Sequence, residues 1–391
     1  MAAGPATVWV LVSNDLTHDQ RVLKTCETLE DLGFEPHLVG REMTHSDAPP
    51  PRFFPTRLRL GFHEGPLFYL ALQIRMLAFL MRRARGSAGI WANDLDTLLP
   101  AWLVAKVFGL PLMYDSHEFF TEAAGLTGHP VKRAVWLALE RALFPRLKAV
   151  TVVNDSIAEA YAERYPRGLA GRPLVVRNMP RRAEALTGVA SREVFEAAGL
   201  QLGPGPLGIL QGAFLDEDRG VREAVSFLAE RSDCQLVVVG AGPEWVWAQG
   251  QIQQFPTQLH LLPKQPYAEL RQMTRAADWG FSLDRPDHGN YLMSLPNKLF
   301  DYIHAGIPVV ASPMPEVAKI VESHGIGTLI DDFSPASIAA AVDRVLAQDG
   351  QDARLRAQRA ADQLHWGAEE PWIHEALRRA GFSLPEGAPS A

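Results

Sequence analysis

Cysteine is scarce in this sequence, and the scarcity limits the class of protein. Cys26 and Cys234 are the only two cysteines among 391 residues. Nothing around either has the spacing of a zinc site or a redox pair, and two domains of ordinary size need no such staple. We therefore expect free thiols in a reducing compartment, which favours a cytoplasmic protein.

Long uninterrupted hydrophobic runs are also missing. The longest apolar segment, Leu67 to Met81, is broken by Gln73 and Arg75, and it falls short of the roughly 18 apolar residues that cross a bilayer. The first residues, Met1 to Val12, show no secretory signal pattern. We expect no membrane span.

The charge excludes a general nucleic-acid-binding protein. Residues 1–180 hold 20 Lys and Arg against 18 Asp and Glu, whereas residues 181–391 hold 18 against 27. A nucleic-acid binder carries a basic stripe over a whole domain. One local basic run, Arg82 to Arg85, ends the apolar segment that begins at Leu67. A core helix with a solvated basic end is the favoured interpretation, and a surface that rests on an anionic membrane is the alternative.

Short apolar runs alternate with helical patterns along the whole chain, which is typical of parallel sheets built from β-α-β units. Val150 to Val153 is continuously apolar, as in a strand covered on both faces. The predicted strands are Val8–Val12, His37–Gly40, Gly89–Ala92, Leu112–Tyr114, Val150–Val153, Leu174–Val176, Leu207–Leu210, Leu236–Val239, Leu259–Leu262, Gly280–Leu283, Val309–Ala311 and Thr328–Ile330.

The pattern restarts after a stretch rich in Pro and Gly, so the prediction is an α/β protein with two doubly wound, Rossmann-like domains that face each other across a cleft. The first domain covers residues 1–180 and the second covers residues 206–365, with a linker at 181–205. Residues 366–391 are expected to pack back on the first domain. Ligands of parallel sheets bind beyond the carboxyl ends of the strands, so functional residues are sought there.

Two glycine-rich or helix-opening motifs stand at strand ends of the second half. Gly240-Ala241-Gly242-Pro243 begins like a dinucleotide fingerprint, but Trp245 occupies the place of its third glycine. A dehydrogenase is therefore disfavoured, and a tight turn beside a ligand and a plain turn remain equal alternatives. Ser294-Leu295-Pro296-Asn297-Lys298 opens a helix that Gly306 closes, with Ser294 expected as the capping residue.

The second motif has the chemistry of a nucleotide diphosphate site. A helix N-terminus and Lys298 suit a diphosphate, and Asp301 on the same helix face can accept two hydrogen bonds from a ribose diol. The plain alternative is a surface pair between Lys298 and Asp301. A second cationic loop, Gly212 to Gly220, reduces the weight of that alternative because it places Arg219 after the strand Leu207–Leu210.

These residues resemble the donor-binding domain of the family 4 (group 1) glycosyltransferases of the GT-B fold, and the resemblance covers nearly the whole chain. Arg219-Gly220 matches the end of the family's Gly-rich loop, and Asp301 with Gly306-Ile307-Pro308-Val309-Val310 matches its acidic residue and the segment that follows. The resemblance implies that Arg219 and Lys298, with Asn297 and Gly212, bind the donor diphosphate. It implies that Asp301 binds the ribose.

The first half carries matching blocks. Tyr114 to Glu122 resembles the family's histidine loop, and His117 is the catalytic match. A histidine after a buried strand is more often structural, but its predicted place in the cleft, with two glutamates beside it, favours catalysis. Asp19-Gln20-Arg21-Val22 and Asn93-Asp94-Leu95-Asp96 resemble blocks of a bacterial surface-polysaccharide branch. The residues expected on the acceptor side are Asn14, Asp94, Glu118 and Glu122.

The sequence also departs from the family pattern. Asp94 and Asp96 are alternatively helix caps, which is the favoured role for Asp96. Met293 stands where many members carry the first of two glutamates, and Ala213 stands where members often carry an arginine. A Ser13-Asn14-Asp15 loop replaces the N-terminal glycine pair of many members.

The resemblance implies a retaining glycosyltransferase that moves a sugar from a nucleotide-sugar donor, UDP favoured by family frequency, to a hydroxyl of a glycan or lipid-linked acceptor. Synthesis of a cell-surface glycan or glycolipid is the expected setting, with possible peripheral contact with the inner membrane surface. No metal or other cofactor is expected, because no Asp-x-Asp follows a donor-domain strand and the site is cationic. Alternatives are a nucleotide-sugar 2-epimerase and a catalytically silent partner in a polysaccharide assembly complex.

Overall fold

The computed structural model describes residues 6–17, 19–43, 51–126, 128–168, 171–182, 190–286 and 292–385. The chain forms two compact units, which are described separately. Unit 1 contains Met1–Asn178 and Glu369–Ala391, and unit 2 contains Met179–Ala368. Residues 183–189 of the predicted linker and 386–391 of the C-terminal segment lie outside the described residues, and the described end of that linker, 190–205, belongs to unit 2.

Unit 1 is built on a sheet of seven parallel strands in the order β3-β2-β1-β4-β5-β6-β7. Its strands are β1 (Ala6–Leu11), β2 (Phe34–Arg41), β3 (Thr56–Leu58), β4 (Gly89–Asn93), β5 (Leu112–Ser116), β6 (Val150–Val152) and β7 (Leu174–Val175). All residues of β4 are buried, as expected for a central strand with both faces covered. The predicted α/β fold with parallel strands is confirmed for this unit.

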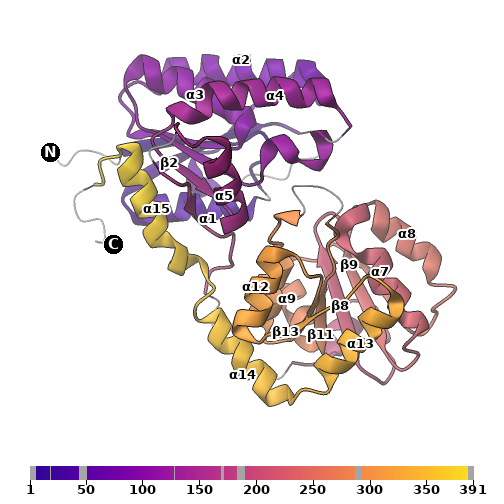
Figure 1. Ribbon diagram of the computed structural model, residues 1–391. Coiled ribbons are helices and arrows are strands. Elements are labelled where there is room, and N and C mark those ends of the chain that lie inside the picture. Colours follow the sequence, from indigo (N-terminus) through magenta and orange to yellow (C-terminus); the bar gives the residue numbers. More distant parts are fainter. Residues whose placement is uncertain are drawn as a thin grey trace. The chain divides into compact units, whose positions relative to one another are not determined.

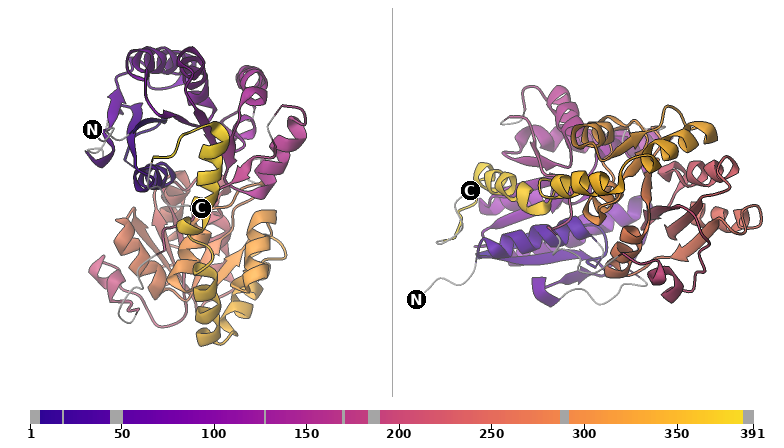
Figure 2. Two further views of the ribbon diagram at one scale, coloured as in Figure 1. Left: turned by 90° about the vertical axis from the view of Figure 1, so that its left-hand side faces the viewer. Right: turned by 90° about the horizontal axis from the view of Figure 1, so that it is seen from below.

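Helices cover both faces of this sheet (Figures 1 and 2). They are α1 (Gln20–Asp31), α2 (Gly65–Arg83), α3 (Leu95–Phe108), α4 (Pro130–Leu143) and α5 (Asp155–Arg164). Local sequence sets several of their ends. Asp19 caps α1 by accepting a hydrogen bond from Val22 N, and Gly109, in the left-handed conformation, ends α3.

Unit 2 has six parallel strands in the order β10-β9-β8-β11-β12-β13. The strands are β8 (Leu207–Gly212), β9 (Gln235–Gly240), β10 (Leu259–Pro263), β11 (Trp279–Ser282), β12 (Val309–Ala311) and β13 (Gly327–Leu329). The helices are α6 (Glu193–Ala197), α7 (Val221–Ser226), α8 (Pro243–Gln251), α9 (Tyr267–Ala276), α11 (Asn297–Ala305), α12 (Pro315–His324), α13 (Pro335–Leu346) and α14 (Gly350–Ala361).

Each face of the unit 2 sheet buries its own hydrophobic core. Successive strand residues point to opposite faces, so Ile209 joins the core under α9, α11 and α12, whereas Leu210 joins the core under α7, α8 and α13. Val309 and Val310 divide in the same way. This explains why the strands are continuously apolar in the sequence.

The last helix, α15 (Trp366–Ala380), begins in unit 2 and continues in unit 1. Trp366 is fully buried, and its backbone N–H donates to the Pro180 oxygen at 2.8 Å. In unit 1, Leu377 is buried, but Trp372 leaves half of its surface exposed.

Both sheets reverse their strand order at a defined point, between β1 and β4 in unit 1 and between β8 and β11 in unit 2. Loops that follow neighbouring strands at such a point diverge to opposite faces and leave a ligand-binding crevice. Among the described residues, no helix has the length and apolar character needed to span a bilayer.

Candidate active site

Polar side chains gather beyond β1, β4 and β5, at the reversal point of the unit 1 sheet. We call Asp19, Asn93, Asp94, Asp115 and His117 the His117 cluster. Asn93 is the last residue of β4, and Asp94 follows it. Asp115 is the second-last residue of β5, and His117 follows that strand. Asp19 stands directly before α1. Residues from three loops thus meet at the place where parallel sheets bind ligands.

Four partners surround the His117 ring. Its Nδ1 lies 3.4 Å from Asp94 Oδ2 and 3.9 Å from Asp19 Oδ2. Its Nε2 lies 3.2 Å from Asn93 Oδ1 and 3.4 Å from Asp115 Oδ2. The His117 backbone N–H also donates to Asp94 Oδ1 at 2.9 Å. This arrangement fixes the ring and surrounds it with acceptors, so it favours the imidazolium form, in which both ring nitrogens donate.

Arg21 holds Asp115 in place beneath the ring. Its Nε and Nη2 donate to the two Asp115 carboxylate oxygens at 2.9 and 2.7 Å, and its Nη1 donates to the Val176 carbonyl at 2.6 Å. Thr151 Oγ1 donates to the same carboxylate at 2.8 Å. Both charged side chains are buried, so these hydrogen bonds replace the water that the charged groups of Arg21 and Asp115 lose on burial.

Asp94 has a strained backbone. Its φ of 58° and ψ of 165° lie in a region that is nearly restricted to glycine and costs of order 1–3 kcal/mol. The backbone N–H of Asp94 donates to the backbone carbonyl oxygen of Asp115 at 2.9 Å. Although Asp94 occupies the N-cap position of α3, its side chain makes no capping bond and instead faces His117. The strain therefore directs a carboxylate toward the ring.

The pKa values of the cluster follow from burial and neighbouring charges. For His117, burial lowers the pKa, but the Asp94 and Asp115 carboxylates outweigh burial and raise it to about 9. Burial raises the pKa of Asp94 to about 7 despite the opposing effect of His117. Burial also acts to raise the pKa of Asp115, yet Arg21 and His117 hold it below its usual range. At neutral pH, the ring is a cation.

The other residues predicted for the acceptor side divide into two groups. Asn14 Nδ2 donates to Asp19 Oδ2 at 3.0 Å, and the Glu118 charge acts on Asp94, so both are close to the His117 cluster. Glu122 instead pairs with Arg133 and Arg164. The acceptor-side role predicted for Glu122 stays a prediction.

Asp96 does not cap α3 through its side chain. The residue is buried, its Oδ1 atom has no hydrogen-bond partner among the described residues, and burial raises its pKa to about 6. The predicted side-chain cap is wrong because α3 begins at Leu95, which places Asp96 inside the first helical turn.

The second group of candidates lies in unit 2, at its own reversal point, and centres on Asp284. Lys298 Nζ lies 3.0 Å from Asp284 Oδ2, and Arg219 Nη1 lies 3.3 Å from Asp284 Oδ1. Asp284 and Lys298 are buried, and Arg219 is one-third exposed. Burial, helped by the charge of Arg219, lowers the pKa of Lys298 although Asp284 opposes the shift. Two cations are thus held around one carboxylate.

The loop that carries Arg219 is seated on the end of β11. Gly220 has a φ of 75°, and a Cβ atom there would lie 2.3 Å from the Leu283 oxygen, so only glycine fits. The Asp218 oxygen accepts from Arg285 N at 3.0 Å. Lys298 Nζ donates to the Arg219 oxygen at 3.3 Å. The backbone, rather than the side chain alone, therefore positions Arg219.

The N-terminus of α11 has no side-chain cap. Pro296 occupies the N-cap position with an extended backbone, and a proline restricts the residue before it from helical geometry. The helix therefore begins at Asn297, too far from Ser294 for the predicted cap. Ser294 Oγ is buried without a hydrogen-bond partner among the described residues. Asn297 is exposed. An N-terminus without a side-chain cap thus stands directly before Lys298.

Asp301 is held one turn further along α11. It accepts hydrogen bonds from Gln211 Nε2 and Tyr267 Oη, each at 3.0 Å. Gln211 is fixed in turn by Thr274 Oγ1, which donates to its Oε1 at 2.7 Å. Burial and the Asp301 charge raise the pKa of Tyr267, so its hydroxyl keeps its proton. Lys298 therefore pairs with Asp284, and Asp301 with Gln211 and Tyr267, rather than Lys298 and Asp301 with each other.

The Gly240 to Pro243 motif is a packing turn. A Cβ atom on Gly240 would lie 2.2 Å from the Gly212 oxygen, and one on Gly242 would lie 2.6 Å from the Leu215 oxygen. Leu215 N donates to the Ala241 oxygen at 2.7 Å. The motif therefore supports the loop that leads to Arg219. In that loop, Ala213 is exposed.

Sequence reasoning missed Gln211, Tyr267 and Asp284. It singled out the segments that contain Arg21, Asn93 and Asp115 but gave these three residues no role. Asp284 follows β11 at the carboxyl end of a strand, so a search of every strand end would have found it. The pairing of Arg21 with Asp115 joins residues 94 positions apart, and no local pattern marks it. Within the part of the chain that the structure describes, no group of three or more His, Cys, Asp or Glu side chains is arranged to hold a metal ion.

Comparisons with known proteins identify the family. The family profile "Glycosyl transferases group 1" matches residues 215–363, and the profile "Glycosyl transferase 4-like domain" matches residues 18–179. A search against proteins of curated function gave no significant match.

Solved structures that resemble the chain share its two-unit fold. Sucrose-phosphate synthase from Thermosynechococcus elongatus superposes with a TM-score of 0.74 at 18% identity, covering 96% of this chain and 98% of that one. HepE from Anabaena, in complex with UDP, gives 0.70 at 14%, covering 95% and 99%. WaaG, a glycosyltransferase involved in lipopolysaccharide biosynthesis, gives 0.67 at 16%, covering 96% and 100%. The chain therefore belongs to the group 1 glycosyltransferases, and it has their GT-B fold of two parallel-sheet units.

Proposed function

We propose that this glycosyltransferase takes its sugar from a UDP-sugar and transfers it, with retention and without a metal ion, to a hydroxyl of a cell-surface glycan or glycolipid precursor. The observation that carries the donor assignment is the pairing of Arg219 and Lys298 around Asp284 at the uncapped N-terminus of α11. A helix N-terminus with two cations is a strong anion site.

In this proposal, the donor diphosphate lies against Arg219, Lys298, the backbone at Gly212 and the first N–H groups of α11, including that of Asn297. The Ser294 hydroxyl, which is buried and without a partner among the described residues, donates to it. Asp301, fixed by Gln211 and Tyr267, accepts hydrogen bonds from the ribose hydroxyls.

Charge develops on the leaving diphosphate when the glycosidic bond breaks, and preorganised cations stabilise that charge. Because Arg219 and Lys298 supply the positive charge from the protein, we propose that no metal ion is required. In this proposal, His117 acts near the reacting sugar through the positive charge of its ring, because its pKa is raised to about 9 and its two ring nitrogens face protein acceptors. Asp94, with Asn14 and Glu118 near it, is proposed for the acceptor side.

Two similar structures support the choice of donor and setting. HepE holds UDP in one structure and UDP-glucose in another, and WaaG is involved in lipopolysaccharide biosynthesis. Retention is the stereochemistry that the family resemblance implies.

We also propose that unit 1 touches the cytoplasmic face of an anionic membrane through α2 and α4. The two helices are joined by Tyr69 and Trp136, whose rings are 5.0 Å apart. Their exposed apolar side chains are Leu67, Leu70, Ile74, Met81, Val131 and Val135. The free buried thiols of the chain are consistent with a reducing compartment.

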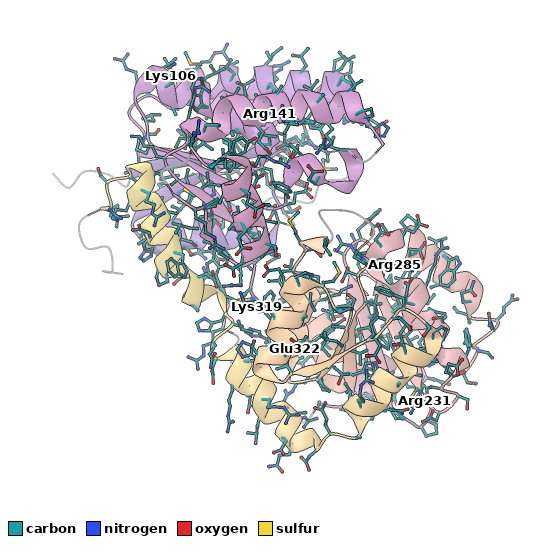
Figure 3. All side chains as sticks on the ribbon, viewed as in Figure 1. Lys106, Arg141, Arg231, Arg285, Lys319 and Glu322 are labelled. Carbon is teal, nitrogen blue, oxygen red and sulfur yellow. The ribbon has the colours of Figure 1, made fainter. Side chains whose placement is uncertain are left out.

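Charge on this face favours an anionic partner. The sequence of α2 contains no acidic residue, and Glu140, the acidic residue of α4, is buried. The exposed cations are Arg75, Arg82, Arg83, Arg85, Lys132 and Arg141. Arg141 lies on the side of unit 1 that α2 and α3 cover (Figures 1 and 3). Apolar and basic side chains together are typical of a surface that rests on anionic lipid.

Donor use is tested by measuring UDP release from UDP-glucose and related UDP-sugars, and GDP release from GDP-mannose, with a lipid extract as acceptor and with or without EDTA. We expect UDP release that EDTA leaves unchanged. Arg219→Ala should lower kcat/KM by about 100-fold or more. Arg222→Ala, a half-exposed neighbour that pairs with Glu244, should have little effect. Activity lost in EDTA and restored by Mg²⁺, or unaffected by Arg219→Ala, would contradict the proposal.

The membrane contact is tested by sedimentation with vesicles of phosphatidylglycerol and of phosphatidylcholine. We expect binding to the former, weakened about tenfold or more by Leu70→Ser with Ile74→Ser, since each buried aliphatic side chain contributes roughly 1.5–3 kcal/mol. Val246→Ser, an equally exposed apolar side chain of unit 2, serves as the control. Equal binding to both lipids, or no effect of the α2 variant, would overturn this assignment.

A further inference from the structure

Unit 2 contains a cationic cavity that is separate from the residues proposed for donor binding. Its volume is about 580 Å³, and α9, α11 and α14 line it. This size is within the range of small-molecule sites. The basic residues in its wall are Arg182, Arg271, Arg275, His304, Arg354 and Arg359.

The charge of this cavity contrasts with the charge of the unit around it. Residues 179–368 hold 16 Lys and Arg against 23 Asp and Glu, so unit 2 is acidic as a whole. Five of those 16 cations line the one cavity, whereas Asp362 is the acidic residue in its wall. Arginines repel one another at close range, so such a concentration costs free energy unless an anion offsets it.

One of these arginines has a donor that no described residue accepts. Nη2 of Arg271 is buried and has no hydrogen-bond partner among the described residues. Arg182 pairs with Asp362 at the rim, where both side chains are more than half exposed. His304 Nε2 lies 2.8 Å from the Leu364 oxygen, so it is engaged. Arg271 is therefore a buried donor that awaits an acceptor.

Helix dipoles account for only part of the cluster. Arg275, His304 and Arg359 are in the last turns of α9, α11 and α14, where a cation stabilises the helix C-terminus. Arg271 and Arg354 stand a turn or more earlier in their helices, and the dipole effect fades within the last turn. These two residues need another explanation.

We propose that this cavity binds a small phosphorylated anion, one that carries two or more phosphate groups. The guanidinium groups of Arg271, Arg354 and Arg359 match phosphate oxygens through paired N–H donors. The cavity and the proposed donor site share no lining residue, since Arg219, Lys298 and Asp301 do not line the cavity. It does not depend on the proposed activity, because the chain's own arginines define it.

Inorganic pyrophosphate is the probe, titrated calorimetrically into the full chain in low salt. Because pyrophosphate also suits the donor site, the titration is repeated on Arg219→Ala. We expect binding that persists in Arg219→Ala and weakens by at least about tenfold per arginine removed in Arg354→Gln with Arg359→Gln.

The matched control is Arg356→Gln. Arg356 belongs to the same helix, but its side chain donates to the Gly325 oxygen and to Gln348 Oε1 at 2.7 Å each, and it does not line the cavity. Its removal should leave pyrophosphate affinity unchanged. Thermal unfolding of each variant verifies that it folds.

Two outcomes would overturn the proposal. One is a wild-type protein whose pyrophosphate binding disappears completely in Arg219→Ala, because the donor site then accounts for all of it. The other is unchanged affinity in the Arg354→Gln, Arg359→Gln variant. A protein that binds pyrophosphate at the cavity but shows no UDP binding would refute the proposed donor and leave the cavity assignment standing.

Discussion

Replacing Asp115 by asparagine tests whether the buried pair with Arg21 organises unit 1. The substitution keeps the shape of the side chain and removes its charge. Arg21, which is buried with Asp115, then keeps its bond to the Val176 carbonyl but loses its anion. Thr151 and His117 lose the charge of a shared acceptor.

The expected cost follows from the burial of both partners. Breaking a buried ion pair by removing one charge costs about 3–5 kcal/mol, which is a large share of the roughly 5–15 kcal/mol that stabilises a domain. For a unit of this size, each kcal/mol lowers Tm by about 2–4 °C. Unit 1 should therefore unfold about 6–20 °C lower, while unit 2 keeps its transition.

Differential scanning calorimetry and urea unfolding measure this change. The double variant Arg21→Met with Asp115→Leu should recover about half of the loss, because no lone charge remains, although the Val176 carbonyl stays without its donor. In NMR titrations, the pKa of His117 should fall in Asp115→Asn because a raising partner is weakened. A cost below about 1 kcal/mol, or a double variant as unstable as the sum of the single ones, would refute the reasoning.

Three further perturbations test the geometry of the two units. Because the pKa of His117 is raised from 6.5 to about 9, folding holds this proton more tightly. The stabilisation of the fold by this proton is complete below pH 6.5 and is lost as the pH rises toward 9, by at most about 3 kcal/mol. Urea unfolding at pH 6 and pH 9.5 should show this loss of stability in wild type and not in His117→Gln. Equal pH dependence in both proteins would exclude the effect. Gly220→Ala should lower the free energy of unfolding by at least about 2 kcal/mol and weaken nucleotide binding. Gly250→Ala, where a Cβ meets nothing within 4 Å, should not destabilise the protein. Thermal melts in which the two variants behave alike would contradict this prediction. Lys298→Met should destabilise unit 2 by about 3 kcal/mol, because Asp284 is buried beside Lys298. Lys319 is exposed, so Lys319→Met should have little effect. Similar urea midpoints for the two variants would count against a structural ion pair.

Buried parallel strands were the most predictable part of the fold. Most contain a run of apolar residues, because side chains of both faces enter a core, as Ile209 and Leu210 do. The strand that escaped prediction, β3, is only Thr56, Arg57 and Leu58, of which Leu58 alone is buried. A three-residue strand at a sheet edge has too little apolar pattern to be recognised.

Residues of the candidate sites were predictable where one local segment carries the chemistry. Lys298 and Asp301 share a helix, and Arg219 belongs to a loop with its own glycine. Their partners come from other elements: Asp284 is 65 positions from Arg219, and Gln211 is 90 from Asp301. Such pairings depend on strand order, which local patterns do not contain. The Ser294 cap failed for a local reason, since Pro296 delays the helix start.

Binding of UDP is the most direct test of the central claim, that unit 2 holds the donor through Arg219, Lys298 and Asp301. Calorimetric titration of UDP into wild type, Arg219→Ala and Asp301→Asn, with Arg222→Ala as the control, measures it. The account predicts a single site in wild type and in the control, and affinity weakened by about tenfold or more in each of the other two variants. Absence of UDP binding at millimolar concentration, or equal affinity in all four proteins, would contradict it.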